Sequence, residues 1–188
     1  MVKKRYVKKS YPLDQIRRHL ETGPIVLVSS AWQGKTNIMT MGWHMVMEFS
    51  PALIGCLISS GNHSFELIRK SQQCVINVPT VDLATTVVKI GNCSGRDTDK
   101  FSEFGLTPKA GTHVRAPLIN ECYASFECTL ADAGWVNKYN VFVFEVVKAH
   151  VATSPKVPKT IHYRGDGEFM ISGENTSRYR KLFRPGML

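Results

Sequence analysis

Several motifs that would assign a chemistry directly are missing from this sequence. It has no serine-hydrolase GxSxG, no zinc-protease HExxH, no phosphate-loop GxxxxGK[ST] and no dinucleotide-binding GxGxxG. Its six histidines are scattered without the spacing of metal ligands. The sequence therefore predicts no catalytic side chain and no metal site, and any activity must come from a bound group or a binding surface.

Cysteine is sparse, and long apolar runs are missing. The five cysteines are an odd number with no CxxC pair, and Cys56 and Cys74 lie in apolar, strand-like runs. They are typical of reduced thiols in a cytoplasmic protein, not of a disulfide framework or a zinc site. No run approaches the ~20 apolar residues that span a bilayer, and no apolar stretch follows the basic N-terminus. We expect a cytoplasmic protein without a membrane partner.

Acidic residues are few at the two ends, and the excess of basic residues there accounts for the net charge of +9. Residues 1–9 hold five basic residues and no acid, whereas residues 156–188 hold seven basic residues and three acids. The body between them is neutral. A folded nucleic-acid binder carries its basic stripe on the body, so no nucleic-acid partner is predicted, and solvated ends are the simpler interpretation.

The length of 188 residues suits a single domain with a sizeable core. We predict a basic tail over residues 1–12, followed by one domain over residues 13–188 that includes a basic C-terminal extension from about residue 156. Pro12-Leu13-Asp14 opens a short helix, with Asp14 as N-cap for residues 15–20.

Strands outnumber helices along the rest of the chain. The alternation of Val141, Val143, Glu145 and Val147 with larger apolar residues gives a long strand over residues 139–151. Further strands are expected at residues 24–30, 37–43, 53–59, 74–78, 124–130 and 160–163, and helices at residues 63–71, 82–90 and around 98–104. Short connections favour a mainly β fold, an antiparallel barrel with peripheral helices and without exposed edges, over a parallel sheet.

Three polar segments remain as candidate binding sites. TNIMTMGWHM (36–45) places methionines and Trp43 where a flat aromatic ligand could lie, although it also suits a core strand. SSGNHS (59–64) precedes a helix whose free N–H groups can bind an anion, although an ordinary cap is the simpler interpretation. SGRDTDKF (94–101) adds Arg96 and Lys100, or is an exposed turn. Together they predict a site for a flat, anionic ligand.

The order of these segments resembles a known family. PIVLVSSAWQGKTNIMTMGW, SPALIGCLISSGNHSFELIRKSQQCVINVPT and GNCSGRDTDKFSEFGLT follow one another as in the flavin reductase-like, FMN-binding split-barrel proteins. The resemblance runs from about Pro24 to Val151, with a weaker echo at residues 162–174. It implies an FMN-binding split β-barrel, and a homodimer with one FMN per subunit near the interface.

The resemblance also implies which residues bind the cofactor. The isoalloxazine ring would meet Asn37, Ile38, Met39, Thr40, Met41 and Trp43, and the ribityl and phosphate groups would meet Ser59, Ser60, His63 and Ser64. The third segment would add Ser94, Gly95 and Lys100. His63 stands where many relatives have a cation with threonine, and either Phe169 or Met170 from the C-terminal segment would lie against the flavin.

The implied activity is an oxidoreductase in which the cofactor carries the chemistry. Hydride from NADH or NADPH would pass to flavin N5, and the electrons would then reduce another flavin, iron(III), a redox protein or oxygen. Three alternatives stay open: an electron carrier of the flavoredoxin type that does not turn over NAD(P)H, a module whose basic ends bind nucleic acid or anionic lipid, and a relative that binds haem, a deazaflavin or no cofactor.

Overall fold

The computed structural model describes residues 4–16, 23–184 and 186. Most of the helix predicted over residues 15–20 lies outside them. The part that is described is a 3-10 helix, η1 (Leu13–Gln15), and Pro12 rather than Asp14 stands at its N-terminus. The prediction of Asp14 as N-cap is therefore wrong, because the helical turn begins two residues earlier than the sequence pattern placed it.

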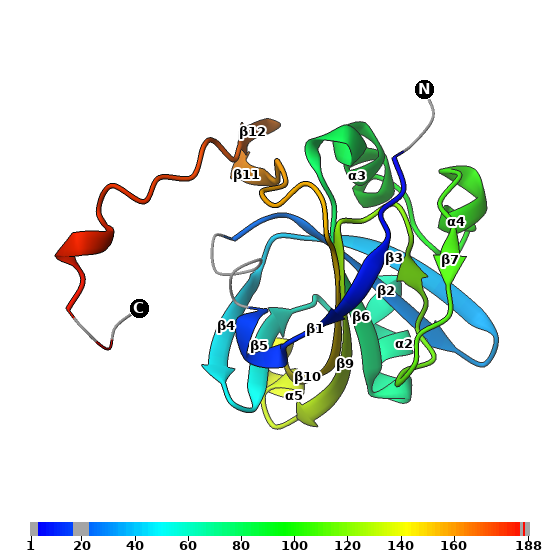
Figure 1. The fold of residues 1–188 in the computed structure, drawn as a ribbon. Helices are drawn as coiled ribbons and strands as arrows, with labels where there is room; N and C mark the ends of the chain where they lie inside the picture. The colour runs from blue at the N-terminus through cyan, green and yellow to red at the C-terminus, as the bar shows by residue number, and fades with distance from the viewer. Residues whose placement is uncertain (1–3, 17–22, 185, 187–188) are drawn as a thin grey trace.

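An antiparallel sheet of eight strands forms the body of the molecule (Figure 1). Seven strands follow a single path, in the order β3 (Lys35–Met41), β2 (Val26–Trp32), β6 (Gln73–Val78), β9 (Ala124–Asp132), β10 (Val141–Ala152), β5 (Ala52–Leu57) and β4 (His44–Phe49). β3 and β4 are consecutive in the chain but stand at opposite ends of this path. The barrel is therefore open between them, as a split β-barrel requires, and the mainly β fold class is confirmed.

β10 shows why the alternating pattern predicted a strand. Phe142, Phe144 and Val146 are fully buried, and the rings of Phe142 and Phe144 stack with centroids 5.8 Å apart. Glu145 and Val147, on the opposite face, are half-buried. The predicted strand begins later than expected, because a short helix, α5 (Val136–Tyr139), precedes it.

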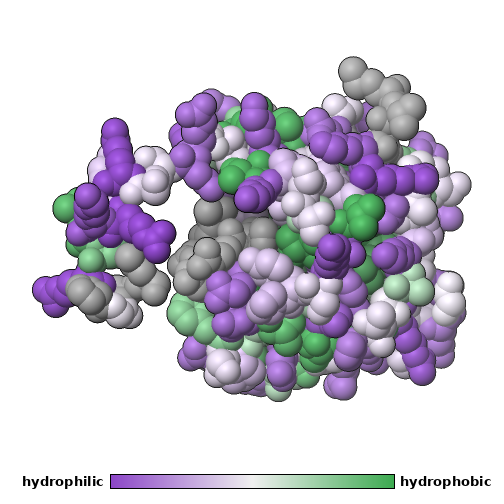
Figure 2. Space-filling model, viewed as in Figure 1, coloured by the Kyte–Doolittle hydropathy of each residue, from purple (hydrophilic) through white to green (hydrophobic). Residues whose placement is uncertain are grey.

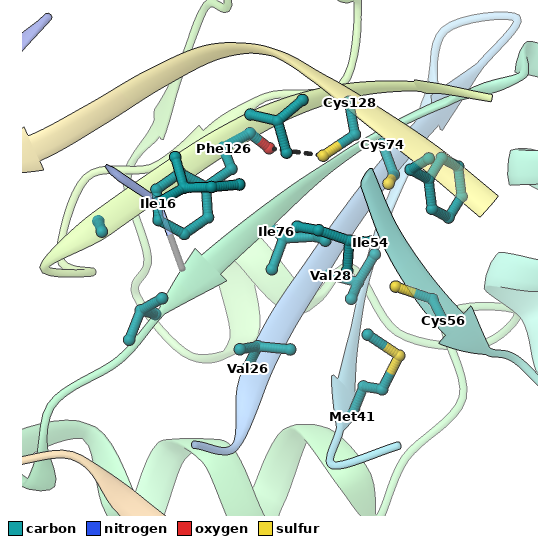
Figure 3. Packing of buried hydrophobic residues seen from close by; sticks show 14 of the residues in the cluster. Ile16, Val26, Val28, Met41, Ile54, Cys56, Cys74, Ile76, Phe126 and Cys128 are labelled. Carbon is teal, nitrogen blue, oxygen red and sulfur yellow. Dashed lines mark hydrogen bonds between the residues drawn. The ribbon is translucent and has the colours of Figure 1, made fainter. Parts of the chain in front are cut away.

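The main core fills the inside of this sheet, where apolar side chains from β2, β5, β6 and β9 converge. Figure 3 shows Val28, Ile54 and Ile76 meeting in its middle. Cys56 and Cys74 also lie in this core, and their complete burial raises the pKa of both thiols well above the ordinary value. All five cysteines are free, as the sequence predicted.

Three helices cover the sheet beside β3. α2 (His63–Ser71) buries Phe65, Leu67 and Ile68, as predicted from its pattern. α3 (Ala84–Gly91) follows the 3-10 turn η2 (Val81–Leu83), so Asp82 lies within that turn instead of capping the helix. α4 (Lys100–Glu103) is capped by Asp99, whose carboxylate accepts from two backbone N–H groups of the helix. A second core forms where α3 and α4 meet the face of β2 and β3 opposite to α2.

The N-terminal segment is built into the sheet instead of forming a free tail. β1 (Lys8–Tyr11) pairs with β10 in antiparallel register, and Tyr6 is buried against Tyr123 with ring centroids 5.6 Å apart. The sequence missed this strand because its side chains are mostly basic and polar. The prediction also missed β4, since its exposed methionines hide the usual alternation.

The C-terminal segment leaves the barrel after β10. It forms a hairpin of β11 (Ile161–Gly165) and β12 (Glu168–Ile171) and ends in η3 (Arg180–Leu182). Beyond the hairpin the chain stands away from the body, and its surface is mostly hydrophilic (Figures 1 and 2). A small two-stranded pair, β7 (Pro108–Lys109) with β8 (Leu118–Ile119), completes the fold. No helix within the described ranges is long and apolar enough to cross a bilayer.

Candidate functional site

An apolar cavity of about 570 Å³ lies at the opening of the barrel. Met39, Thr40 and Met41 of β3 form one wall, and α3 forms another. Because β3 ends the sheet, one edge of its backbone is available to a ligand. The volume falls within the ~300–1,000 Å³ that small-molecule sites usually offer.

Two further elements complete the apolar cavity. Trp43, which follows the bend after β3, stands at its mouth with 73% of its surface exposed. The β11–β12 hairpin contributes Tyr163 and Phe169, whose rings contact each other with centroids 5.1 Å apart. Met170 does not line the cavity. Of the two C-terminal candidates left open by the sequence, only Phe169 therefore faces this space.

Thr40 links the apolar cavity to α3. Its hydroxyl donates a hydrogen bond of 2.7 Å to the carbonyl oxygen of Val87. The hydroxyl hydrogen is thereby used, and Thr40 Oγ1 can only accept a hydrogen bond from a ligand. Asn62 and Asn92 supply the other polar side chains of the wall, together with Ser59.

A second cavity, which we call the basic cavity, lies toward the other end of β3 and measures about 670 Å³. Lys35, His63 and Arg96 line it, together with Thr36 and the loop of residues 95–99, which also contributes Asp97 and Asp99. Burial lowers the pKa of His63, the charges of Arg96, Lys35 and Lys100 lower it further, and the charge of Asp97 opposes them. His63 is therefore mainly neutral at pH 7. The positive charge that an anion would meet comes from Lys35 and Arg96, and the two carboxylates reduce it.

Asn37 joins the elements that surround both cavities. It is 3% exposed, and its amide nitrogen donates a 2.9 Å hydrogen bond to the hydroxyl of Ser64 in α2. A Cβ atom on Gly95 would lie only 2.0 Å from Asn37 Oδ1. Glycine at this position therefore lets the 94–99 loop press directly on the Asn37 amide, and β3, α2 and the loop are held together.

The structure brings together seven of the thirteen predicted site residues. Those that line the apolar cavity are Met39, Thr40, Met41, Trp43 and Ser59, and those that line the basic cavity are His63 and Gly95. Six others line neither cavity: Asn37, Ile38, Ser60, Ser64, Ser94 and Lys100.

Several of these six have visible structural roles. Ile38 is fully buried in the second core, and Ser94 Oγ accepts from the backbone N–H of Arg96, which shapes the loop. Lys100 is 5% exposed, and its ammonium donates to the carbonyl oxygen of Ile90 near the end of α3. Its contribution to the basic cavity is therefore a nearby charge rather than a contact.

Many lining residues come from outside the three polar segments and were not predicted. Among them are Gly34, Lys35, Leu57, Val87, Val88 and Tyr163. Most are ordinary turn, helix or strand residues, so no sequence signal marks them. Their role arises because β3, α3 and the C-terminal hairpin meet in space.

The two cavities match one kind of ligand. An apolar, aromatic-lined space and a space with cationic side chains lie along a single strand, and the consecutive residues Asn62 and His63 line one each, which suits a flat ring system with an attached anionic group. Gly95 lets its loop press against Asn37, where a Cβ atom has no room. These residues fit a flavin mononucleotide.

Comparisons with known proteins agree with this geometry. Residues 17–168 match the family model described as "Flavin reductase like domain". The uncharacterized protein YddH of Escherichia coli is 30% identical over 179 residues, a match that covers 88% of this chain and 95% of that protein.

Two solved structures share the fold. An FMN-binding domain of a flavin reductases-like enzyme from Shewanella baltica superposes with a TM-score of 0.84 at 26% identity, covering 92% of this chain and 98% of that one. The flavoredoxin of Desulfovibrio vulgaris gives a TM-score of 0.76 at 23% identity, covering 83% and 90%.

Proposed function

The chain belongs to the flavin reductase-like family, and on that premise we propose that it binds FMN and acts as a flavin-dependent oxidoreductase. The observation that carries this proposal is the pair of cavities that follow one another along β3, one apolar and one with Lys35 and Arg96 in its wall. The match to an FMN-binding structure from Shewanella baltica supports the choice of cofactor.

The residues would divide the binding of FMN between them. Met39, Met41 and Trp43 would pack on the ring, and the exposed edge of β3 would meet its polar rim. Lys35 and Arg96 would neutralise the phosphate, and His63 would donate an N–H to it. Asn37, Ser64 and Gly95 would position these groups without touching the cofactor.

FMN, when bound, supplies a centre that accepts hydride from NADH or NADPH at N5 and passes electrons to another flavin, iron(III) or a redox protein. The chain's own part is to hold and orient the ring in the apolar cavity. The five free cysteines support a cytoplasmic location, where thiols remain reduced.

The proposal is tested by comparing FMN with riboflavin, which lacks the phosphate. FMN should bind about tenfold more tightly, because its phosphate meets Lys35 and Arg96. Arg96→Ala should remove most of this advantage and leave the riboflavin affinity unchanged. Arg69→Ala is the matched control, since Arg69 is an exposed arginine that pairs with Glu66 on α2. A colourless protein that binds neither flavin would sink the proposal.

One observation favours the electron carrier as a second candidate. Tyr163 and Phe169 line the apolar cavity from the side of the hairpin, and their paired rings would compete with a nicotinamide ring for that side of a bound flavin. Anaerobic mixing of the FMN-loaded protein with NADH and with NADPH separates the two functions. Rapid bleaching of the flavin absorbance supports the reductase. If the wild type and Met170→Ala keep their flavin absorbance while Phe169→Ala loses it, the ring of Phe169 blocks the nicotinamide in the native protein. This result supports the carrier.

We also propose that the protein works as a homodimer. Trp43 immediately precedes β4, Met45, Met47 and Phe49 alternate along it, and each of the four is at least 40% exposed. Such a row of large apolar side chains usually marks an interface. Trp43 belongs both to this row and to the mouth of the apolar cavity, so a second copy seated on β4 would border the flavin.

A further inference from the structure

His44 is the first residue of β4 and lies behind the mouth of the apolar cavity. It directly follows Trp43 in the chain, and its ring is half-buried. The ring atom Nε2 lies 2.8 Å from the carbonyl oxygen of Pro24. Because a carbonyl oxygen can only accept a hydrogen bond, Nε2 carries the ring hydrogen and Nδ1 keeps a bare lone pair. Nδ1 is buried, and no described residue is its hydrogen-bond partner.

The hydrogen bond from His44 to Pro24 connects two walls of the apolar cavity. Ile25, the next residue, lines the cavity, and its backbone N–H donates a 2.8 Å hydrogen bond to the carbonyl oxygen of Ile161 in β11. A Cβ atom on Gly42 would lie 3.0 Å from Ile25 Cδ1, so the bend after β3 packs closely on Ile25 as well. The segment of Pro24 and Ile25 therefore holds both the bend before β4 and the base of the β11–β12 hairpin.

The surroundings of His44 supply no charge that would stabilise a protonated ring. Among the described residues of the elements packed against it, the titratable groups are Cys56, which lies opposite on β5, and Asp14 on η1. The Cys56 thiol is neutral because burial raises its pKa, and Asp14 is exposed, as is Glu48 farther along β4. Burial lowers the pKa of His44, although the hydrogen bond to Pro24 acts in the opposite direction.

We propose that His44 is a positioning residue that latches the mouth of the flavin cavity while its ring is neutral. This inference rests on the proposed flavin site. A proton on Nδ1 would create a buried donor without an acceptor, which is unfavourable. The ring would turn toward water and release Pro24, and the bend and the hairpin would lose their common anchor. Flavin affinity should therefore be full above pH 6.5, the ordinary pKa of histidine, and should fall below it.

The test measures the dissociation constant of riboflavin at about pH 7.5 and about pH 5.5. Riboflavin is the probe because the phosphate of FMN titrates near pH 6 and would add its own pH dependence. In the wild type the constant should rise about fivefold at the lower pH. His44→Gln keeps an amide that can donate to the Pro24 carbonyl but does not titrate. Its riboflavin constant should therefore be the same at both pH values, within about twofold.

His113→Gln is the matched control, since His113 is an exposed histidine outside both flavin cavities. It should show the pH dependence of the wild type. Nitrogen NMR of the histidine rings gives a second readout without flavin. At about pH 7.5 the hydrogen of His44 should lie on Nε2, and Nδ1 should take up a proton only below pH 6.5.

Three results would overturn the inference and leave the proposed function standing. They are a wild-type riboflavin constant that does not change with pH, a pH dependence that survives in His44→Gln, and a His44 ring that takes up its proton at or above pH 6.5. The NMR result decides alone if His44→Gln does not fold. A wild-type protein that binds neither riboflavin nor FMN at about pH 7.5 would overturn the proposed function and the inference with it.

Discussion

At the scale of single residues, Gly95 is the position where the site has least tolerance. A Cβ atom there would overlap the Asn37 amide at 2.0 Å, and Asn37 is held by Ser64. Gly95→Ala should therefore displace the amide or the loop. We expect a loss of about 1–3 kcal/mol in the free energy of unfolding and a weaker FMN affinity. Thermal melting and flavin titration measure the two effects.

The control for this prediction is Gly61→Ala in the neighbouring β5–α2 turn. A Cβ atom at Gly61 would come no closer than 3.8 Å to Ser59 Oγ, which is ordinary contact. This variant should keep both stability and flavin affinity. If Gly95→Ala behaved like Gly61→Ala, close packing on Asn37 would not be important for the site.

Glu127 is a second residue whose role can be tested, through the dependence of protein stability on pH. Its carboxylate is fully buried on β9 and accepts hydrogen bonds from the backbone of residues 112–114 and from His150. Burial alone would raise its pKa, but the hydrogen bonds from His150, His113 and Thr112 outweigh burial and lower it to about 2. A carboxyl group whose pKa is lower in the folded than in the unfolded protein stabilises the fold at pH values above the unfolded pKa, which is about 4.5 here.

This stabilisation should be lost as the pH falls from about 4.5 toward 2, a range that follows from the two pKa values. Glu127→Gln should lower the free energy of unfolding at pH 7 by about 2–4 kcal/mol and flatten this acid dependence. Urea unfolding at several pH values measures both effects. Glu145→Gln is the control, because Glu145 is a half-buried glutamate on β10. An acid dependence as steep in Glu127→Gln as in the wild type would contradict the assignment.

At the scale of elements, β1 and the C-terminal segment make opposite contributions to stability. Residues 8–11 pair with β10, Tyr6 just before them is buried, and Lys8 donates to the carbonyl oxygens of Ile119 and Asn120. The described residues after 173 are exposed instead. Both segments are basic, so composition alone does not distinguish them.

Deletion of residues 1–11 should lower the melting temperature by about 10 °C, because about 3 kcal/mol of burial and strand pairing is lost. FMN affinity should not change, since none of the residues from 4 to 11, the described part of this segment, lines either cavity. Deletion of residues 175–188 is the matched control and should leave the melting temperature within about 2 °C. Equal effects of both deletions would show that β1 is not an integral strand.

At the scale of the whole molecule, the row of exposed apolar side chains along β4 is a surface that stays uncovered in a single chain. Met45 and Met47 both lie over Gly55 of β5, where a Cβ atom would be 3.1 Å and 3.0 Å from them. Met47→Lys should convert the proposed dimer to a monomer, because a charge in the centre of an apolar interface is costly. Light scattering after size exclusion gives the mass.

Leu182→Lys is the control, since Leu182 is 79% exposed on the C-terminal segment. It should leave the mass unchanged. If the wild type is already monomeric at micromolar concentration, the homodimer proposal fails, and the flavin site must be complete within one chain. If Met47→Lys remains dimeric, a different face forms the interface.

The predictable part of the fold follows from short-range patterns. The alternation in β10 and the one-sided pattern of Phe65, Leu67 and Ile68 in α2 are properties of adjacent residues, so they were readable from the sequence. β1 and β4 were missed because their stability comes from pairing with distant strands rather than from their own composition. The position of the Lys100 side chain could not be predicted from the sequence either, since its hydrogen-bond partner Ile90 lies on another helix.

The sequence by itself determined that the chain is a mainly β domain, and it indicated through three polar segments that the ligand is flat and anionic. Only the tertiary structure decided which side chains face that ligand. It turned Ser64 and Lys100 away from the cavities and brought Lys35, Arg96 and Phe169 to them. The physical reason is that a site is made by groups that become neighbours only when the sheet closes around its core, whereas sequence patterns report on neighbours along the chain.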